Sequence, residues 1–166
     1  GHSGRVYAVG FHPQGALLVS GSDDGTARVW NVATGREQTR FDDHAAPVRG
    51  AAFGPAGRTL VTVGWDNSVR IRSLPGFELL EPVWNGPYRM ETLAFDPTGK
   101  LLAVGDVEGR VIVGEVGSLE RRVVLRETGR GIQELAFGPE GRHLAVGAAD
   151  GGVRIFDVLE GLEVLG

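Results

Sequence analysis

The sequence contains the residue types of a hydrolytic triad. His2, Ser20 and Asp24 could supply a general base, a nucleophile and a carboxylate that orients the base. In such a triad the histidine takes the serine proton while the serine oxygen attacks an acyl carbon. Residue types alone do not make a triad, because catalysis requires the three groups to meet beside an open site. The triad is therefore a hypothesis that depends on the folded arrangement.

Metal chemistry finds less support in the sequence. The segment 22–25, Ser-Asp-Asp-Gly, lacks the Asp-x-Asp-x-Asp-Gly order of a calcium loop and is typical of a hairpin turn. No cysteine is present, and the histidines lack metal-ligand spacing. Two of them, His12 and His143, fall on turn or strand positions where we expect solvent exposure. The sequence thus implies neither a metal nor a cofactor.

Composition describes an ordinary soluble domain. The 166 residues are 42% hydrophobic and 23% charged, with a net charge of −4 that gives no reason to expect nucleic acid. The lack of cysteine and of a long apolar run predicts a cytoplasmic protein that binds no membrane. The arginine bias, with Lys100 the one lysine, suggests a bacterial source. Because the chain starts at Gly1 and its one methionine is Met90, we expect it to be processed or excised.

An internal repeat organises the chain. The pattern Phe-x-Pro-x-Gly begins at Phe11, Phe53, Phe95 and Phe137, at a constant step of 42 residues. An acidic residue follows each phenylalanine by 13 positions, at Asp24, Asp66, Glu108 and Asp150. The repeat divides the chain at about 1–42, 43–84, 85–126 and 127–166.

Each repeat predicts four short strands. Apolar residues alternate with a period of two in short runs bounded by turn residues, which is typical of strands. In the first repeat the strands are expected at 6–11, 17–22, 27–31 and 36–41, and the later repeats follow the same plan. Four antiparallel strands in about 42 residues indicate a propeller blade, which is too small to bury both faces alone.

The repeat resembles the WD-repeat family. The resemblance rests on Gly1-His2, on the segment 20–26 (Ser-Gly-Ser-Asp-Asp-Gly-Thr) and on Val29-Trp30-Asn31, and it is weakest in the third repeat. It implies an all-β propeller of four blades with four antiparallel strands each, either a half-ring or half of an eight-bladed ring. It also implies a buried hydrogen-bonded network in each blade that joins a histidine, a strand hydroxyl, the turn aspartate and a tryptophan.

The four repeats match this network to different degrees. The first carries all four members as His2, Ser20, Asp24 and Trp30, which favours a structural role for the triad residues. The second keeps His44, Thr62 and Asp66, but Arg72 replaces the tryptophan, so we expect the network to be incomplete. The third and fourth have lost more members, and we expect those blades to rely on apolar packing. Their residues at the four positions are Gly86, Val104, Glu108 and Gly114, and Thr128, Val146, Asp150 and Phe156.

The same resemblance implies a partner-binding rim. In this family, loops at one edge of the blades commonly bind protein partners, at three positions of each blade. Arginine, tyrosine and tryptophan at such positions are the types that dominate interface hot spots. An alternative is that Trp65 packs over its own blade and that the arginines are only solvated charges. The residues proposed for binding are Arg5, Tyr7, Asp23, Arg49, Trp65, Arg89, Glu91 and Gln133; Pro47, Val107, Gly131 and Ala149 complete the register.

The two outer flanks of the repeat array should be apolar. We expect exposed Val6, Val9 and Leu18 on the first blade, and Val153 and Ile155 on the last. Apolar faces of this kind mark missing partners. Either further propeller blades cover them, or a second copy of the chain closes a ring. In both cases the isolated chain should not behave as a compact monomer, and in the second case it should form a dimer.

Three functions remain open at this point. The first is a docking or sensor propeller that binds protein partners without catalysis. The second is an enzyme or ligand-binding propeller with chemistry on the innermost strands, whose polar members offer only two carboxylates, Glu91 and Glu134. The third is a structural module that completes a propeller with a second chain. The sequence favours the first function and does not separate it from the third.

Overall fold

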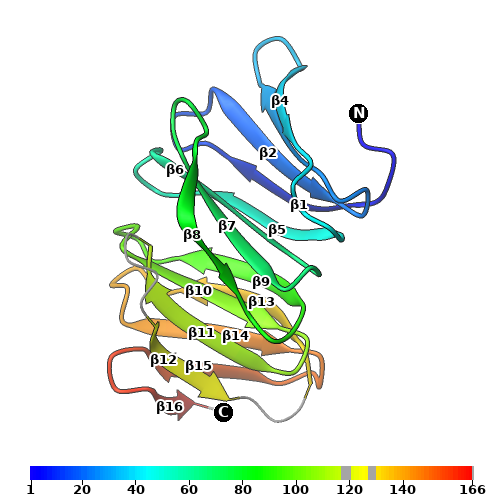
Figure 1. The fold of residues 1–166 in the computed structure, drawn as a ribbon. Coiled ribbons are helices and arrows are strands. Elements are labelled where there is room, and N and C mark those ends of the chain that lie inside the picture. The colour runs from blue at the N-terminus through cyan, green and yellow to red at the C-terminus, as the bar shows by residue number, and fades with distance from the viewer. Residues whose placement is uncertain (117–120, 127–129, 166) are drawn as a thin grey trace. The chain divides into compact units, whose positions relative to one another are not determined.

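The computed structural model describes residues 1–116, 121–126 and 130–165, without the side chains of 81–83, 121–123 and 126. Every regular element in this described part is a β-strand, and the strands form four antiparallel sheets of four. Figure 1 shows each sheet as a run of neighbouring colours, because each is built from one continuous stretch of chain. No described helix is long and apolar enough to cross a bilayer.

The strand bounds follow the expected repeat. The first sheet consists of β1 (Val6–Phe11), β2 (Leu17–Ser22), β3 (Ala27–Asn31) and β4 (Arg36–Phe41). The second consists of β5 (Val48–Phe53), β6 (Thr59–Gly64), β7 (Ser68–Ser73) and β8 (Leu79–Asn85). The third consists of β9 (Met90–Phe95), β10 (Leu101–Asp106), β11 (Arg110–Glu115) and β12 (Arg121–Arg126). The fourth consists of β13 (Ile132–Phe137), β14 (His143–Ala148), β15 (Val153–Asp157) and β16 (Leu162–Leu165).

Each sheet is a simple meander in which sequential strands pair. This order is that of a propeller blade, so the predicted all-β fold of four four-stranded antiparallel blades is confirmed. The repeated Phe-x-Pro-x-Gly segment forms the first turn of each sheet. Its glycine has a positive φ each time, at +76° for Gly15 and +72° for Gly141, which explains why the motif requires glycine there.

The chain divides into two compact units, residues 1–90 and 91–166. In the first unit β5 packs against β1 and β2. The core of this joint joins Val19 and Val29 of the first sheet to Ala51, Phe53 and Leu60 of the second. In the second unit β13 packs against β10. Its core contains Ala103, Val111, Val113, Leu125, Ile132, Leu135, Leu144, Val146, Phe156 and Val158. Each sheet thus buries its apolar side chains against a neighbour rather than within itself.

The first sheet has an exposed apolar face, which we call the leading face and define by Val6, Val9, Phe11 and Val32. Val9 is 67% exposed and Phe11 64% exposed. The residues that stand 42 positions later, Ala51 and Phe53, are each 7% exposed because the second sheet uses them to pack against the first.

The fourth sheet has the opposite face exposed, which we call the trailing face and define by Ala136, Val153 and Ile155. Val153 is 67% exposed, whereas the equivalent residues Ala27, Val69 and Val111 are fully buried. Of the predicted flank residues, Val6, Val9 and Val153 are exposed as expected, while Leu18 and Ile155 are half-buried because their own sheets shield them.

Candidate functional site

A hydrogen-bonded relay joins the strands of the first sheet. The Trp30 indole N–H donates to Ser20 Oγ at 2.8 Å, and Ser20 Oγ lies 2.7 Å from His2 Nε2. His2 Nδ1 lies 3.0 Å from Asp24 Oδ2, and the Thr26 hydroxyl donates to the other carboxylate oxygen at 2.6 Å. Each donor is satisfied if Ser20 donates to His2 Nε2 and His2 donates from Nδ1 to Asp24. The four predicted members therefore meet in one network.

This relay brings Ser20, His2 and Asp24 within the distances of a hydrolytic triad. Two features argue for a structural role instead. Ser20 is buried, and its oxygen already accepts the Trp30 N–H, which occupies one of the two lone pairs of the hydroxyl. A triad needs an open position beside the serine, and the packing of Ser20 provides none.

The network holds Asp24 in its ionised form. Burial by itself raises the pKa of Asp24, but hydrogen bonds from Thr26, Ser3 and His2 together lower the pKa well below its usual range. We expect Asp24→Ala to reduce the free energy of unfolding by about 1–3 kcal/mol, because His2 and Thr26 lose their acceptor. The matched change is Glu108→Ala, at the equivalent but exposed position of the third repeat. Equal losses in urea denaturation would count against the network.

Acidification tests the same contribution. The pKa of Asp24 is lower in the folded protein than in the unfolded chain, so its stabilisation is complete above the unfolded pKa of about 3.9 and is lost as the pH falls below it. The wild-type chain should therefore lose more stability between about pH 5 and pH 3 than Asp24→Ala does.

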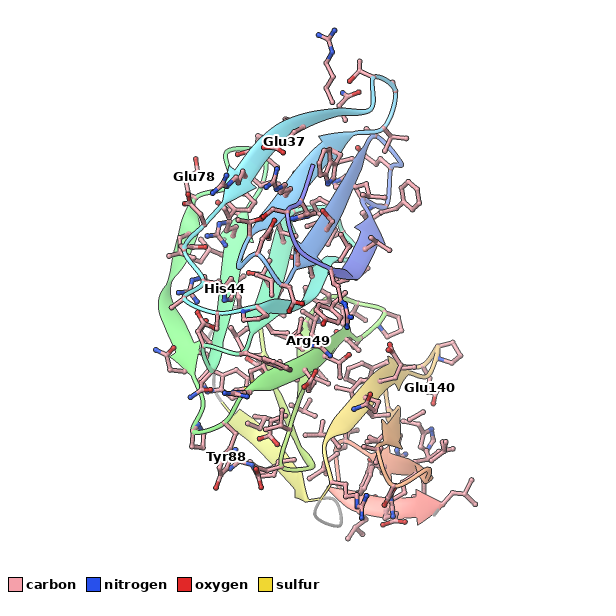
Figure 2. The ribbon with its side chains drawn as sticks, turned by 90° about the vertical axis from the view of Figure 1, so that its right-hand side faces the viewer. Glu37, His44, Arg49, Glu78, Tyr88 and Glu140 are labelled. Carbon is pink, nitrogen blue, oxygen red and sulfur yellow. The ribbon has the colours of Figure 1, made fainter. Side chains whose placement is uncertain are left out.

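The second sheet keeps part of the network and changes the rest. His44 Nδ1 lies 3.0 Å from Asp66 Oδ1, and His44 Nε2 lies 2.8 Å from Thr62 Oγ1. Figure 2 labels His44. The tryptophan position is occupied by Arg72, as the sequence indicates, and the Arg72 guanidinium forms an ion pair with Asp43.

In the second sheet, the ion pair of Arg72 and Asp43 takes the place that the Trp30 indole has in the first sheet. The Arg72 side chain is 5% exposed, and its guanidinium carbon lies 4.2 Å from the centre of the Phe41 ring. Burial lowers the pKa of Arg72, and the charge of Asp43 opposes that effect. Arg72 Nη1 finds no hydrogen-bond partner among the described residues. Arg72 therefore depends on a single carboxylate, from the connection between β4 and β5.

The third sheet has the expected apolar core and adds a polar pair at one turn. Asp106, at the end of β10, is fully buried and accepts hydrogen bonds from Arg110 Nε at 2.8 Å and Nη2 at 2.6 Å. The backbone N–H of Glu108 also donates to Asp106, at 2.9 Å. The fourth sheet has an ion pair of 3.2 Å between Asp150 and Arg154. Thr128, the predicted network position of this repeat, lies outside the described residues.

The expectation that His12 is exposed to solvent is wrong, because its side chain is buried. The Gln14 backbone N–H donates to His12 Nδ1 at 3.2 Å, and His12 Nε2 lies 3.1 Å from the Gly57 carbonyl oxygen. The ring also meets Phe53 edge-on, with 5.2 Å between ring centres. His12 therefore connects the first turn of the first sheet to the first turn of the second sheet. His143 lies at a partly exposed position beside Glu140, as expected for a solvated histidine.

Backbone hydrogen bonds at the opposite edge of the sheets connect the predicted rim positions. The Asp23 N–H donates to the Arg5 carbonyl at 2.8 Å, and the Trp65 N–H donates to the Pro47 carbonyl at 2.9 Å. In the fourth sheet the Ala149 N–H donates to the Gly131 carbonyl at 2.9 Å. The register of the repeat thus places equivalent residues in equivalent surroundings.

The first unit brings five of the predicted rim residues together. The Arg49 guanidinium carbon lies 3.7 Å from the centre of the Tyr7 ring and 5.0 Å from that of Trp65. The Arg89 guanidinium carbon lies 5.1 Å from the Trp65 ring centre. Tyr7 donates its hydroxyl hydrogen bond to Asp23 at 3.2 Å. We call Tyr7, Arg49, Trp65 and Arg89 the arginine–aromatic stack; Figure 2 labels Arg49 within it.

The remaining rim residues are placed differently. Arg5 is exposed and contacts Asp23 through its main chain. Glu91 and Gln133 belong to the second unit, where Gln133 is exposed and Glu91 is half-buried. Trp65 is only partly exposed, and its ring is covered by two guanidinium groups. The stack itself could not be predicted from residue types, because ring and guanidinium orientations depend on side-chain rotamers.

The segment 22–25 forms the predicted turn. The Gly25 N–H donates to the Ser22 carbonyl at 3.2 Å, and Gly25 has a φ of +77°. The Asp24 carboxylate, which a calcium loop would direct at the ion, binds His2 and Thr26 instead. Within the described ranges no cluster of three or more histidine or acidic side chains is arranged to hold a metal.

Comparison with known families agrees with the fold. The family model described as WD domain, G-beta repeat, matches residues 1–31, 35–73 and 121–157. The chain belongs to the WD-repeat family. The matches leave out residues 74–120, which contain most of the third repeat, where the WD-repeat residues are eroded.

Individual WD-repeat relatives are much longer than this chain. Coronin-7 of Bos taurus is 39% identical over 88 residues, which cover 52% of this chain and 9% of that protein. The periodic tryptophan protein 2 homolog of Caenorhabditis elegans is 29% identical over 108 residues, which cover 64% of this chain and 12% of that protein. Pre-mRNA-processing factor 19 of Oryza sativa subsp. japonica is 30% identical over 107 residues, which cover 61% of this chain and 19% of that protein. These relatives are eukaryotic, so they do not support a bacterial source, which stays a prediction.

Proposed function

We propose that this chain is a non-catalytic docking scaffold, which binds protein partners on the rim that carries the arginine–aromatic stack. The stack is the observation that carries this proposal. Membership of the WD-repeat family supports it.

The stack has the chemistry of an interface centre. Tryptophan, tyrosine and arginine dominate binding hot spots because they offer large contact areas with a polar end. Arg49 and Arg89 contact the Trp65 ring, which limits the rotamers of all three side chains. A surface that is ordered before binding loses less conformational entropy when a partner docks.

Truncating Trp65 should separate binding from stability. We expect Trp65→Ala to weaken partner binding by about 2 kcal/mol or more. The same change should alter the free energy of unfolding by less than about 1 kcal/mol, because the ring is partly exposed and contacts long surface side chains. The measurement uses peptides selected from an unbiased display library against the wild-type chain, whose affinities are then compared between variants.

The matched control is Arg58→Ala, which removes an exposed residue from the β5–β6 turn at the opposite edge of the second sheet. Its peptide affinities should equal those of the wild type. If Trp65→Ala unfolds the chain while Arg58→Ala weakens binding, Trp65 is a packing residue and the rim is wrongly assigned.

A second candidate function is that of a structural module which joins another propeller segment. It is favoured by the exposure of the leading and trailing faces at positions whose equivalents are buried elsewhere in the chain. The leading face of the first sheet corresponds to the face by which the second sheet packs on the first. The trailing face of the fourth sheet corresponds to the face that receives such a neighbour. Two copies of the chain could therefore join end to end.

A further inference from the structure

The stack lies in the more basic part of an acidic chain. Residues 1–90 contain nine arginines and eight carboxylates, whereas residues 91–166 contain eight basic and thirteen acidic residues. The rim positions of the first unit hold Arg5, Arg49 and Arg89 against Asp23. Over all the positions proposed for binding, these three arginines stand against two carboxylates, Asp23 and Glu91, so the rim is weakly positive whereas the chain has a net charge of −4.

Some arginines of the first unit are neutralised within the fold. Arg28 forms ion pairs of 2.8 Å with Glu37 and 3.5 Å with Asp24. Arg70 pairs with Asp66 at 3.2 Å. Arg89, in contrast, contacts the Trp65 ring and forms no ion pair within the described part of the chain. Arg58 is also exposed, but Arg89 differs from it by lying beside a partly exposed aromatic ring at the rim, where its charge is available to a docking partner.

The Arg89 side chain also carries donors that suit a carboxylate. Its guanidinium is planar, lies beside the Trp65 ring and holds its N–H donors in a fixed geometry. These donors form a fork that matches the two oxygens of a carboxylate. Arg5, an exposed cation at the same edge, is held by the bond between its carbonyl and the Asp23 N–H.

We propose that the stack recognises an acidic protein segment. A carboxylate of the segment pairs with Arg89, and an apolar side chain beside it contacts the exposed part of the Trp65 ring. This inference rests on the proposed docking function and adds the chemistry of the partner. Nucleic acid is the less favourable ligand, because an extended phosphate backbone needs a row of cations, whereas the rim positions of the first unit offer only Arg5, Arg49 and Arg89.

The test compares short fluorescein-labelled peptides by fluorescence anisotropy. One probe combines glutamate and leucine with glycine and serine, and a second has glutamine in place of every glutamate. We expect the full chain to bind the glutamate probe about tenfold more tightly at low salt, with the difference shrinking as salt is added. Equal affinities for the two probes would overturn the inference, as would the absence of binding to either.

Two variants locate the effect. Arg89→Gln should reduce affinity for the glutamate probe by about tenfold while leaving the glutamine probe unchanged. Arg58→Gln removes an exposed arginine at the opposite edge and should change neither affinity. A similar loss in Arg58→Gln would show a diffuse charge effect and contradict the stack as the site. Tighter binding of a phosphoserine peptide or of oligo-deoxythymidine would replace the carboxylate partner by that ligand.

Failure of this inference can be told apart from failure of the docking function. If peptides from the unbiased library depend on Trp65 but contain no acidic residues, the rim is a docking site and its charge preference is wrongly inferred. If no selected peptide depends on Trp65, the docking function itself fails.

Discussion

Replacing Asp43 by alanine should lower the free energy of unfolding by about 2–3 kcal/mol, because it leaves the buried Arg72 guanidinium without its counter-ion and removes one of the two carboxylates that pair with Arg70. Removing one partner of a fully buried pair typically costs roughly 3–5 kcal/mol. The expected loss is smaller here because the Asp43 side chain is 35% exposed and water screens part of the interaction. Urea denaturation of the purified chain measures the change.

The neighbouring residue provides a matched control. Asp42 pairs with Arg40 at 3.4 Å, and the two side chains are largely exposed. Asp42→Ala should therefore cost less than about 0.5 kcal/mol. Equal losses for the two alanine variants would mean that the pair of Asp43 and Arg72 has no special role.

A second change should restore the stability that Asp43→Ala removes. In the first sheet Trp30 donates its indole N–H to Ser20, and Thr62 and Arg72 stand at the equivalent positions of the second sheet. Arg72→Trp in the Asp43→Ala background should thus replace an unpaired charge with an indole that donates to Thr62. Recovery of most of the lost stability is the expected result; no recovery would show that the site cannot accept the indole.

The fold could be predicted from the sequence because its repeat is regular. The constant step between Phe11, Phe53, Phe95 and Phe137 defines the strand pattern, and one repeat is enough to interpret the others. The relay of the first sheet was also predictable, since all four of its residue types are present in register. Here local pattern and tertiary packing agree.

The polar substitutes in the later sheets could not be predicted in this way. Asp43 lies 29 residues from Arg72, in a connection with no regular spacing. Asp106 replaces residues that are uncharged in the other repeats, Ser22, Gly64 and Ala148, so the repeat gave no indication of its pairing with Arg110. His12 is buried because a turn of the next sheet lies over it. These features depend on contacts between elements rather than on spacing within one element.

The exposed leading and trailing faces predict that copies of the purified chain associate. A stable apolar joint forms in the first unit when Ala51, Phe53 and Leu60 of one sheet cover Val19 and Val29 of another. Val9 and Phe11 stand one repeat before Ala51 and Phe53, and Ile155 stands three repeats after Val29. The leading face of one copy and the trailing face of another can therefore form the same kind of joint. Two copies together hold eight sheets, within the four to eight blades of known propellers.

We expect light scattering to give about twice the chain mass of 17.6 kDa, with the fraction of dimer increasing as the protein concentration rises. Val153→Asp places a carboxylate on the trailing face and should weaken association by about a hundredfold or more, because the charge would be buried without a partner. Leu159→Asp is the control, since Leu159 is 64% exposed but lies in the turn between β15 and β16. A folded wild-type monomer at every concentration, or equal dissociation in both variants, would overturn the end-to-end joint.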